Sequence, residues 1–336
     1  MIRDAIATVV AGKDLSEADA AATMEEIMAG EATPSQIAAL LVGLRMKGES
    51  VDEMAGMVRV MRAKALRVEV DGDLLDTCST GGGAFDPLNI STAAALVCAG
   101  AGVRVAKHGN RGFSSASGAA DVLEALGAKI DLGPEQVKVC IERTGFGFLF
   151  AQTFHPAMRH AGPTRREIGI RTIFNSLGPL TNPAGAQYQL LGVGEAALAP
   201  KIAQVLARLG TGRALVVHSE DGLDEVSLGA ETFVHEITGH DVRFYVITPE
   251  EAGLERVPLA AVKSGTPQEN AARIRSLFAG AKGPDRDYVL INAAAALVAA
   301  GRAKDVREGV EIARTSIDSG AAGRVLLAYV TASNEV

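Results

Sequence analysis

The sequence has no tryptophan, and aromatic residues make up only 4% of its 336 residues. A surface that stacks nucleic-acid bases needs several exposed rings, so such a platform is not expected. A basic surplus is missing as well, because 33 lysines and arginines stand against 40 aspartates and glutamates, a formal net charge of -7. Proteins that bind nucleic acid through its phosphates usually carry that surplus. These two shortages argue against a nucleic-acid partner.

Cysteine and long apolar runs are also scarce. The three cysteines, Cys78, Cys98 and Cys140, are widely spaced in apolar stretches, with neither a C-x-x-C pair nor a zinc spacing among them. Reduced, mostly buried thiols are therefore expected. Residues 1–13 lack the apolar core and cleavage site of a signal peptide, and the apolar run 293–300 is far shorter than the roughly 20 residues that span a bilayer. We expect a cytoplasmic protein without membrane contact.

Length and composition predict about two domains. The chain is 48% hydrophobic, enough for a large interior, and roughly 150 residues per domain suggests two. Residues 1–70 show helical patterns only, with capping boxes at 33–36 and 50–53 that each precede an apolar stripe rich in leucine or methionine. Such stripes are usually core or helix interface. Short amphipathic helices bury little surface alone, so this domain should pack on the rest of the chain and on a second copy.

From residue 74 onward, β-rich runs alternate with helical stretches. Helices are expected at 119–126, at 200–209 and from Pro267 to the end. The expected strands are continuous apolar runs, namely 103–106, 146–150, 190–193, 214–217 and 242–247. This alternation is typical of an α/β fold whose central, mostly parallel sheet is buried on both faces. Ligands bind such sheets at loops beyond the carboxyl ends of the strands.

A glycine-rich loop is the first candidate for binding chemistry. Gly81, Gly82 and Gly83 follow the segment 76–80, and a backbone without Cβ atoms lets N–H groups approach an anion closely. Asn89, Ser91 and Thr92 then add amide and hydroxyl donors at the positive end of a helix that begins there. A structural turn would explain the glycines alone, and a helix N-cap would explain the polar residues alone. Together they favour phosphate binding.

A basic turn is the second candidate. Lys107, His108, Gly109, Asn110 and Arg111 directly follow an expected strand, and a serine-rich loop comes next. An exposed basic turn would explain the charges by themselves. The position at the end of a strand favours a second phosphate contact. A histidine such as His108 is by itself more often structural than catalytic.

An acidic turn and a further basic segment complete the set. Adjacent Asp224 and Glu225 follow the expected strand 214–217. Acidic turns are usually solvated and need no ligand. However, Mg²⁺ takes one or two protein carboxylates and completes its coordination shell with water and phosphate, so this pair could hold it. The segment 155–167 holds several basic groups, among them Arg165. A guanidinium there could clamp a carboxylate, although a solvated basic face explains these residues equally simply. The glycine loops and the acidic pair are complementary parts of a site for a magnesium-bound diphosphate.

The order and spacing of these segments resemble the anthranilate phosphoribosyltransferase family over nearly the whole chain. The segments that carry the resemblance are 89–92, 106–111, 120–127, 154–158, 169–175, 177–185 and 221–225. The resemblance implies a small all-helical domain that forms a homodimer contact, placed at 1–70 with a contribution from about 160–185. It also implies a larger α/β domain at 71–336, of the nucleoside phosphorylase and phosphoribosyltransferase kind. The implied reaction transfers the phosphoribosyl group of phosphoribosyl pyrophosphate to anthranilate, giving N-(5'-phosphoribosyl)anthranilate and diphosphate.

The resemblance further implies roles for individual residues. The positions implied to border phosphoribosyl pyrophosphate are Ser79, Gly81, Gly82, Gly83, Pro87, Asn89, Ile90, Ser91, Thr92, Lys107, His108, Gly109, Asn110, Arg111, Ser114, Ser115 and Ala119. The implied Mg²⁺ positions are Ser91, Asp224 and Glu225, and the implied anthranilate contacts are Ser79, Asn110 and Arg165. Because the amine attacks the anomeric carbon as the diphosphate departs, positioning and electrostatics should supply most of the acceleration. No obligatory general acid or base is expected.

The glycine loop departs from the family's usual Gly-Thr-Gly-Gly-Asp. Ser79 replaces the first glycine and Gly83 replaces the aspartate at unchanged loop length, while Asp86 lies three residues further on. The change removes a carboxylate beside the metal and adds a side chain at the amine pocket. Three alternatives stay open: a pyrimidine nucleoside phosphorylase, whose phosphate motif reads Lys-His-Ser-Thr-Gly-Gly; a non-catalytic relative that binds nucleic acid; and the same transfer to another aromatic amine.

Overall fold

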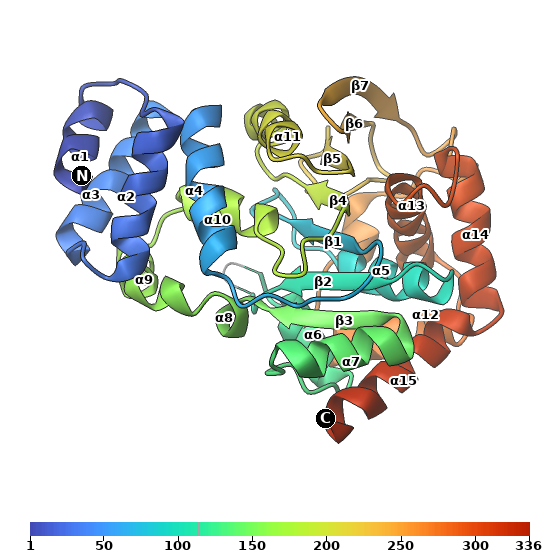
Figure 1. Ribbon diagram of the computed structural model, residues 1–336. Helices are drawn as coiled ribbons and strands as arrows, with labels where there is room; N and C mark the ends of the chain where they lie inside the picture. Colours follow the sequence, from blue (N-terminus) through green and yellow to red (C-terminus); the bar gives the residue numbers. More distant parts are fainter. Residues whose placement is uncertain (113–114) are drawn as a thin grey trace.

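A computed structural model describes residues 1–112 and 115–336 and divides into a helical part and an α/β part (Figure 1). The helical part begins with α1 (Ile2–Val10), α2 (Glu17–Ala29), α3 (Pro34–Lys47) and α4 (Val51–Lys64). Two short helices from the middle of the chain join it. The first, α9 (Gly162–Ile168), packs on α3, and the second, α10 (Ile173–Leu177), packs on α3 and α4.

The two expected capping boxes form and hold the helical part together. The box at 33–36 closes the start of α3, and the box between Ser50 and Glu53 closes the start of α4. The Glu53 carboxylate is fully buried and also accepts hydrogen bonds from the Leu15 N–H and from the Lys47 ammonium, both at 3.0 Å. A signal that starts a helix locally therefore also ties α4 to the loop before α2 and to the end of α3.

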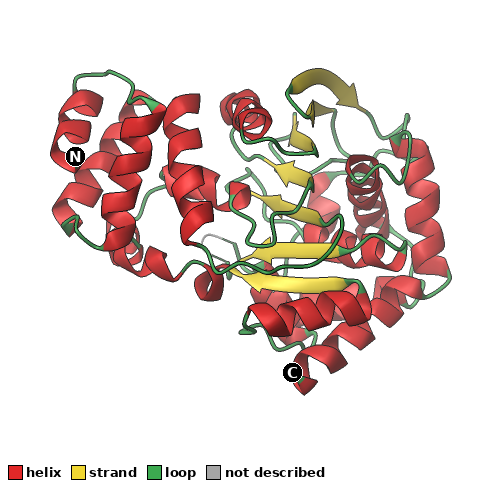
Figure 2. Cartoon of the chain, viewed as in Figure 1, coloured by secondary structure: helices red, strands yellow, loops and turns green. Residues whose placement is uncertain are grey.

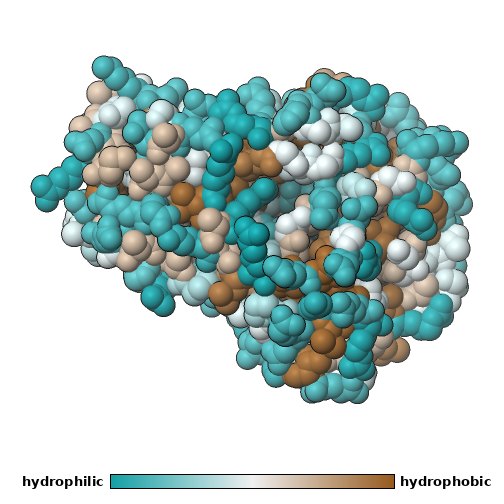
Figure 3. Space-filling model, viewed as in Figure 1, coloured by the Kyte–Doolittle hydropathy of each residue, from teal (hydrophilic) through white to brown (hydrophobic). Residues whose placement is uncertain are grey.

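The methionine stripes lie in the core, as expected. Five methionines are buried between the helices: Met24, Met28, Met54, Met57 and Met61. Their cluster continues through α10 and α11 (Ala199–Arg208) onto one face of the sheet. On the face of the molecule in Figure 3, apolar surface is visible where the helical part meets the α/β part. Hydrophobic burial across this junction couples the two parts.

The α/β part is built on a seven-stranded sheet (Figure 2). Its strands are β1 (Leu75–Ser79), β2 (Val105–Gly109), β3 (Phe146–Phe150), β4 (Tyr188–Gly192), β5 (Arg213–Ser219), β6 (Thr232–Thr238) and β7 (Asp241–Ile247). Their order is β3-β2-β1-β4-β5-β6-β7, parallel from β3 to β5 and antiparallel at β6 and β7. The predicted α/β class with a mostly parallel sheet is confirmed.

Helices cover both faces of the sheet, and the expected helical C-terminal region is confirmed. Besides α11, the helices of the α/β part are α5 (Ile90–Gly100), α6 (Ala119–Ala125), α7 (Pro134–Thr144), α8 (Ala151–Phe154), α12 (Pro267–Phe278), α13 (Pro284–Ala299), α14 (Val306–Asp318) and α15 (Ala321–Glu335). Short 3₁₀ turns are η1 (Pro156–His160), η2 (Gly178–Leu180), η3 (Ala196–Leu198) and η4 (Leu259–Val262). Across the described part of the chain, no helix is both long and apolar enough to cross a membrane.

Two strands were absent from the expectation, for different reasons. Strand β1 reads Leu-Asp-Thr-Cys-Ser, so its buried residues are largely polar and give no apolar run. Strand β6 alternates between buried and partly exposed residues, which is the pattern of a strand in an antiparallel pair with one solvated face. Continuous apolar runs therefore mark the parallel strands β2, β3, β4 and β5 and the antiparallel β7, but neither of these two.

The connections create a topological switch point between β1 and β4. From β1 the chain builds outward to β2 and β3 on one side, and it later returns to place β4 and β5 on the other. Ser79 at the end of β1 pairs in register with Gly192 at the end of β4. Loops that leave adjacent strands in opposite directions open a crevice at this point, where ligands of open α/β sheets bind.

Candidate active site

The glycine loop leaves β1 at this crevice with an open backbone. Gly81 and Gly82 have φ angles of 63° and 77°, a left-handed conformation that favours glycine. The Gly81 N–H donates to the Ser79 hydroxyl oxygen at 3.2 Å. A Cβ on Gly82 would lie 2.3 Å from an Nη atom of Arg171, so a side chain there would displace the guanidinium. The loop thus presents backbone to the crevice, with a cation beside it.

Arg171 is a site residue that the sequence analysis did not assign. Its Nη2 donates to the Thr80 carbonyl at 2.9 Å, and its charge acts to lower the pKa of Asp224. It lies in the segment 169–175, which carries part of the family resemblance, but nothing local distinguishes it from the neighbouring arginines. Only the return of the chain from the helical part to the sheet brings it beside the glycine loop.

The acidic turn packs directly against the glycine loop and β4. A Cβ on Gly83 would lie 2.9 Å from an Asp224 carboxylate oxygen and 2.9 Å from the Gly222 carbonyl. A Cβ on Gly192 would lie 1.7 Å from the Asp224 carbonyl oxygen. An aspartate at position 83 would require this packing to shift. Glycine at both positions lets the acidic turn sit close to the loop.

The two carboxylates of this turn fit a magnesium site. Burial first, and then the charge of Asp224, raises the pKa of Glu225 to about 8, and burial also raises the pKa of Asp224. Glu225 accepts the Ser91 N–H at 3.1 Å through Oε1, while its buried Oε2 has no hydrogen-bond partner among the described residues. Together with the Ser91 hydroxyl these are the hard oxygen ligands that Mg²⁺ prefers. Across the described residues no cluster of three or more His, Cys, Asp or Glu could hold a metal, so water and phosphate would complete the shell.

Lys107, a residue of β2, contacts this group of residues through its buried ammonium. Only 1% of its surface is exposed, and its ammonium donates to the Thr77 carbonyl and, at 3.3 Å, to the Ser91 hydroxyl. Burial lowers the pKa of Lys107, while its charge acts to lower the pKa of Glu225. The expected cation is therefore part of the site, but it neutralises the acidic turn from inside the sheet and does not project from the basic turn.

The rest of the basic turn is held by protein partners. The Arg111 guanidinium pairs with Asp121 at 3.0 Å and with Glu124, and it lies 5.7 Å from the centre of the Phe150 ring. Exposed Asn110 accepts the Arg111 N–H at 2.8 Å. The structure thus places Asn110 and Arg111 at the carboxyl end of β2, as expected, with the guanidinium directed onto α6.

The start of α5 holds the neighbouring loop. Asn89 is the N-cap residue but makes no side-chain cap; its amide instead donates to the Ser117 carbonyl at 2.8 Å and accepts the Ser117 hydroxyl at 3.0 Å. The Ile90 side chain is fully buried in the core, so its backbone alone could face a ligand. Within the described residues, the buried Thr92 hydroxyl has no partner. Pro87 forms an isolated bridge with Lys263.

The other predicted positions lie along the loop between β2 and α6. A Cβ on Gly109 would lie 2.9 Å from the Phe148 ring and 3.1 Å from the Ala119 side chain at the start of α6. Ser115 is exposed, and Ser114 lies outside the described residues. The loop is fastened at Asp86, whose carboxylate accepts the Ala116 N–H at 2.8 Å.

Two buried histidines with uncharged rings pack against each other beside the basic turn. The rings of His108 and His155 are 5.1 Å apart and both residues are buried. Burial lowers the pKa of His108 well below its usual value and lowers the pKa of His155 to about 4. Among the described residues no carboxylate contacts either ring. No described partner therefore marks either histidine as a general base.

Arg165 offers an unpaired guanidinium on the helical side. It lies on α9, 5.1 Å from the centre of the Phe174 ring, and burial lowers its pKa to about 10. In the described structure it forms no ion pair, and no contact joins it to Ser79 or Asn110. Its planar donors are available to a carboxylate that arrives between the two parts.

The fold and the site define a two-domain glycosyltransferase. Residues 71–323 match the family described as glycosyl transferase family, a/b domain, and residues 3–65 match its helical bundle domain. The chain is 56% identical over 323 residues to the anthranilate phosphoribosyltransferase of Chloroflexus aggregans, covering 96% of this chain and 95% of that relative. The chain belongs to the anthranilate phosphoribosyltransferase family.

Solved structures agree with this membership. The crystal structure of the anthranilate phosphoribosyltransferase from Thermus thermophilus is similar with a TM-score of 0.93 and 48% identity, covering 98% of this chain and 99% of that one. The Saccharomyces cerevisiae enzyme in complex with PRPP and Mg is similar with a TM-score of 0.93 and 27% identity, covering 100% of this chain and 98% of that one.

Proposed function

We propose that this protein transfers the phosphoribosyl group of phosphoribosyl pyrophosphate to anthranilate, releasing diphosphate. The observation that carries the proposal is the meeting of the glycine loop with the Asp224–Glu225 turn at the β1/β4 switch point. An anion-binding backbone and an oxygen-ligand pair in one crevice suit a magnesium-bound diphosphate. Family membership and the magnesium and PRPP complex of the yeast relative support the same substrate.

The residues of the crevice would act by positioning and by charge. The N–H groups of the loop 81–83 and the Arg171 guanidinium would bind the diphosphate oxygens. Asp224, Glu225 and the Ser91 hydroxyl would hold Mg²⁺, whose charge stabilises the departing diphosphate. Lys107 would offset part of the negative charge of the carboxylate pair, and bound Mg²⁺ would keep both acids ionised. The pre-set arrangement lowers the barrier because charge moves onto groups that are already oriented.

The acceptor would enter between the two parts. Arg165 would clamp the anthranilate carboxylate, Asn110 would contact the acceptor from the basic turn, and the neutral rings of His108 and His155 would line an environment suited to an aromatic amine. Ser79 would border both substrates. The amine is neutral at working pH, so its attack needs no obligatory base.

The same proposal covers assembly and location. We place the boundary between the helical and α/β domains near residue 70 and assign the helical part as the homodimer contact. Met46 is 83% exposed and Val10 is 70% exposed on α3 and α1, and covering such side chains would stabilise a dimer. Three buried free cysteines are compatible with the reducing cytoplasm.

A fluorescence assay tests the function directly. Purified protein is mixed with phosphoribosyl pyrophosphate, Mg²⁺ and anthranilate, and the loss of anthranilate fluorescence is followed with time. Turnover that disappears with a chelator supports the proposal. Turnover with another aromatic amine but not with anthranilate would contradict the acceptor. Absence of turnover together with salt-sensitive binding of DNA or RNA would contradict the reaction itself.

A further inference from the structure

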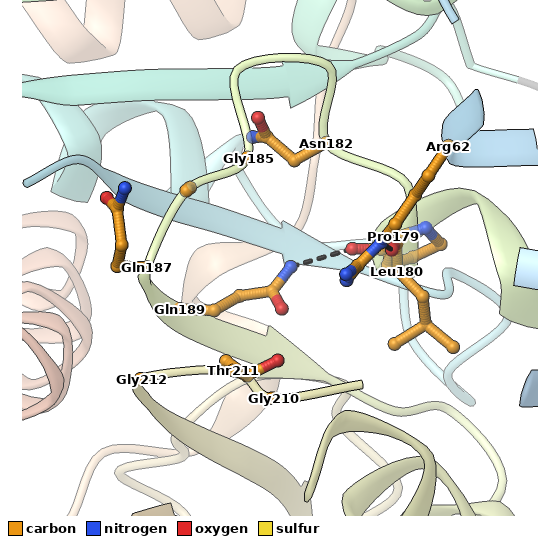
Figure 4. A pocket seen from close by; sticks show the side chains of 11 residues that line it. Arg62, Pro179, Leu180, Asn182, Gly185, Gln187, Gln189, Gly210, Thr211 and Gly212 are labelled. Carbon is orange, nitrogen blue, oxygen red and sulfur yellow. Dashed lines mark hydrogen bonds between the residues drawn. The ribbon is translucent and has the colours of Figure 1, made fainter. Parts of the chain in front are cut away.

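A cavity of about 100 Å³ lies between the helical part and the sheet. Its lining comes from α4, from the segment around η2 and from the turns that precede β4 and β5, namely Arg62, Pro179, Leu180, Asn182, Gly185, Ala186, Gln187, Gln189, Gly210, Thr211 and Gly212. None of these belongs to the candidate active site, and none is acidic. Figure 4 shows the Arg62 side chain reaching from α4 into this group of residues.

Arg62 is a partly buried cation that forms no ion pair with any described residue. Its Nε donates to the Leu180 carbonyl at 2.7 Å, and within the described residues the guanidinium makes no other hydrogen bond and no ion pair. Burial lowers its pKa, with no neighbouring acid to oppose the effect. A charge taken out of water is costly unless a partner is present. Arg213, on the nearby β5, shows the usual solution, because Glu236 binds it at 2.6 Å.

The other polar groups of the cavity fall into two kinds. Asn182 and Gln189 are already engaged: Asn182 donates to Asp76 at 2.9 Å, and Gln189 donates to the Pro179 carbonyl at 2.7 Å. Thr211 differs, because no partner in the described part of the chain binds its hydroxyl. Gln187 accepts the Leu74 N–H through its oxygen and keeps its amide N–H groups free of described partners. The donors left over, a guanidinium, a hydroxyl and this amide, all suit an anion, and the lining contains no carboxylate that would favour a cation instead.

We propose that this cavity binds a small oxyanion, held by the Arg62 guanidinium and the Thr211 hydroxyl. The volume suits a tetrahedral anion or a small carboxylate, and a guanidinium fork matches two oxygens of either. The bound anion would bridge α4 of the helical part to the turn before β5. It would also adjoin Gln189, which contacts Cys78 directly before Ser79. Occupancy would therefore stabilise the junction of the two parts behind the active site.

Crystals of the full chain soaked in selenate locate the anion. Selenium gives an anomalous signal, and we expect a peak within hydrogen-bonding distance of the Arg62 guanidinium in the wild-type protein. Arg62→Gln should abolish this peak and leave any peak at the glycine loop unchanged. No peak at Arg62, or a peak that persists in the Arg62→Gln protein, would overturn the proposal.

Binding in solution gives an independent measure. Sulfate and acetate are titrated separately by calorimetry at constant ionic strength, with the active site saturated by phosphoribosyl pyrophosphate and Mg²⁺. We expect Arg62→Gln to weaken binding at least about tenfold, the effect of one charged hydrogen bond. Arg59→Gln is the matched control, because Arg59 lies on the same helix but is exposed and paired with Glu17. Equal binding by both variants would overturn the proposal.

Two further variants guard against a folding defect. Arg62→Lys keeps the charge but loses the fork, and Thr211→Val keeps the shape of the side chain but loses the hydroxyl. Each should weaken binding while preserving the fold, as checked by the unfolding midpoint without the anion. Preference for sulfate over acetate would identify a tetrahedral ligand, and the reverse would identify a carboxylate. Undiminished binding of both anions in both variants would contradict the site.

Discussion

The two sides of the active-site crevice are constructed in different ways. On one side, the glycine loop and the acidic turn approach so closely that a single added Cβ would meet Asp224. On the other side, the basic turn is held by side-chain contacts of Arg111 with Asp121 and Glu124. The first side depends on backbone packing and the second on ion pairs and loop contacts. Substitutions that add side-chain volume should therefore lower stability and activity far more on the first side than on the second.

This contrast also separates the electrostatics of the two sides. Asp224 and Glu225 are buried acids whose raised pKa values mark the need for a cation. His108 and His155 are buried bases whose lowered pKa values keep them neutral. Under the proposed function, the first side would concentrate positive charge on a diphosphate and the second would accept a neutral aromatic amine. Such a division would let a site with several ionisable groups work without a proton-transfer catalyst.

The largest effect should follow from removing the carboxylate pair. The double variant Asp224→Asn with Glu225→Gln should lower kcat/KM at least about 10³-fold, because the diphosphate loses its metal-based stabilisation. Its unfolding midpoint without Mg²⁺ should equal or exceed that of the wild type, since the cost of burying two acids whose ionisation is unfavourable there is gone. Glu220→Gln, on an exposed residue near the same turn, is the control.

His108→Gln provides the opposite comparison. It should retain substantial turnover, because burial favours the neutral form of the histidine and no described carboxylate contacts its ring. A loss as deep as that of the double carboxylate variant would show that the basic side does supply an essential base. The contrast between the two sides would then be wrong.

The next effect should come from Gly192→Ala. The new Cβ would lie 1.7 Å from the Asp224 carbonyl, and both β4 and the acidic turn are fixed by their neighbours. We expect a stability loss of about 2 to 3 kcal/mol from overpacking and a loss of about 10² in kcat/KM from displacement of the turn. Urea unfolding and steady-state kinetics measure the two. Gly178→Ala is the control, because nothing lies within 4 Å of its added Cβ.

The sequence predicted the elements and the loops better than the direction of side chains. The loops that carry residues 107–111 and 224–225 could be predicted, because aliphatic strands and the glycines that end them are local features of the sequence. The polar strand β1 was not found, although it supports the glycine loop. Its burial depends on its neighbours in the sheet, β2 and β4, which are more than 25 residues away in sequence.

Partners far apart in sequence explain the remaining differences. Asn89 was expected to add a donor at a helix start, but its amide binds Ser117. Lys107 was expected in a turn after a strand, where it would contact phosphate, but it lies within β2, and β1 and Ser91 bury its ammonium. Arg171 was not assigned to the site at all. In each case the residue type was informative, while its partner was fixed only by tertiary contacts.

A pH series tests whether the buried ring of His155 is uncharged in the folded protein. His155 has a pKa of about 4 in the folded chain, against an ordinary value of 6.5. Below pH 6.5 the unfolded chain binds a proton that the folded chain excludes, so the stability contribution of neutral His155 is present above pH 6.5 and is lost as the pH falls toward 4. Relative to the wild type, His155→Gln should gain about 2 kcal/mol of stability between about pH 7.5 and about pH 5. Urea unfolding at both values measures this; a constant difference would mean that the pKa of His155 is the same in the folded and unfolded chains.

The smallest effect concerns Ser79, which replaces the family's usual glycine. Two variants separate the effect of its hydroxyl from the effect of its Cβ. Its hydroxyl accepts the Gly81 N–H and acts to lower the pKa of Asp224, so it can link the loop to the acidic turn, whereas its Cβ would narrow the acceptor side. Ser79→Ala removes the hydroxyl alone, and Ser79→Gly removes both. If the hydroxyl orients Asp224, both variants should raise the Mg²⁺ concentration needed for half-maximal activity by about three- to tenfold, the effect of one hydrogen bond to a carboxylate. If the Cβ shapes the amine pocket, only Ser79→Gly should change KM for anthranilate. Two variants with unaltered magnesium dependence would show that packing at Gly83 and Gly192 fixes Asp224 without help from this serine.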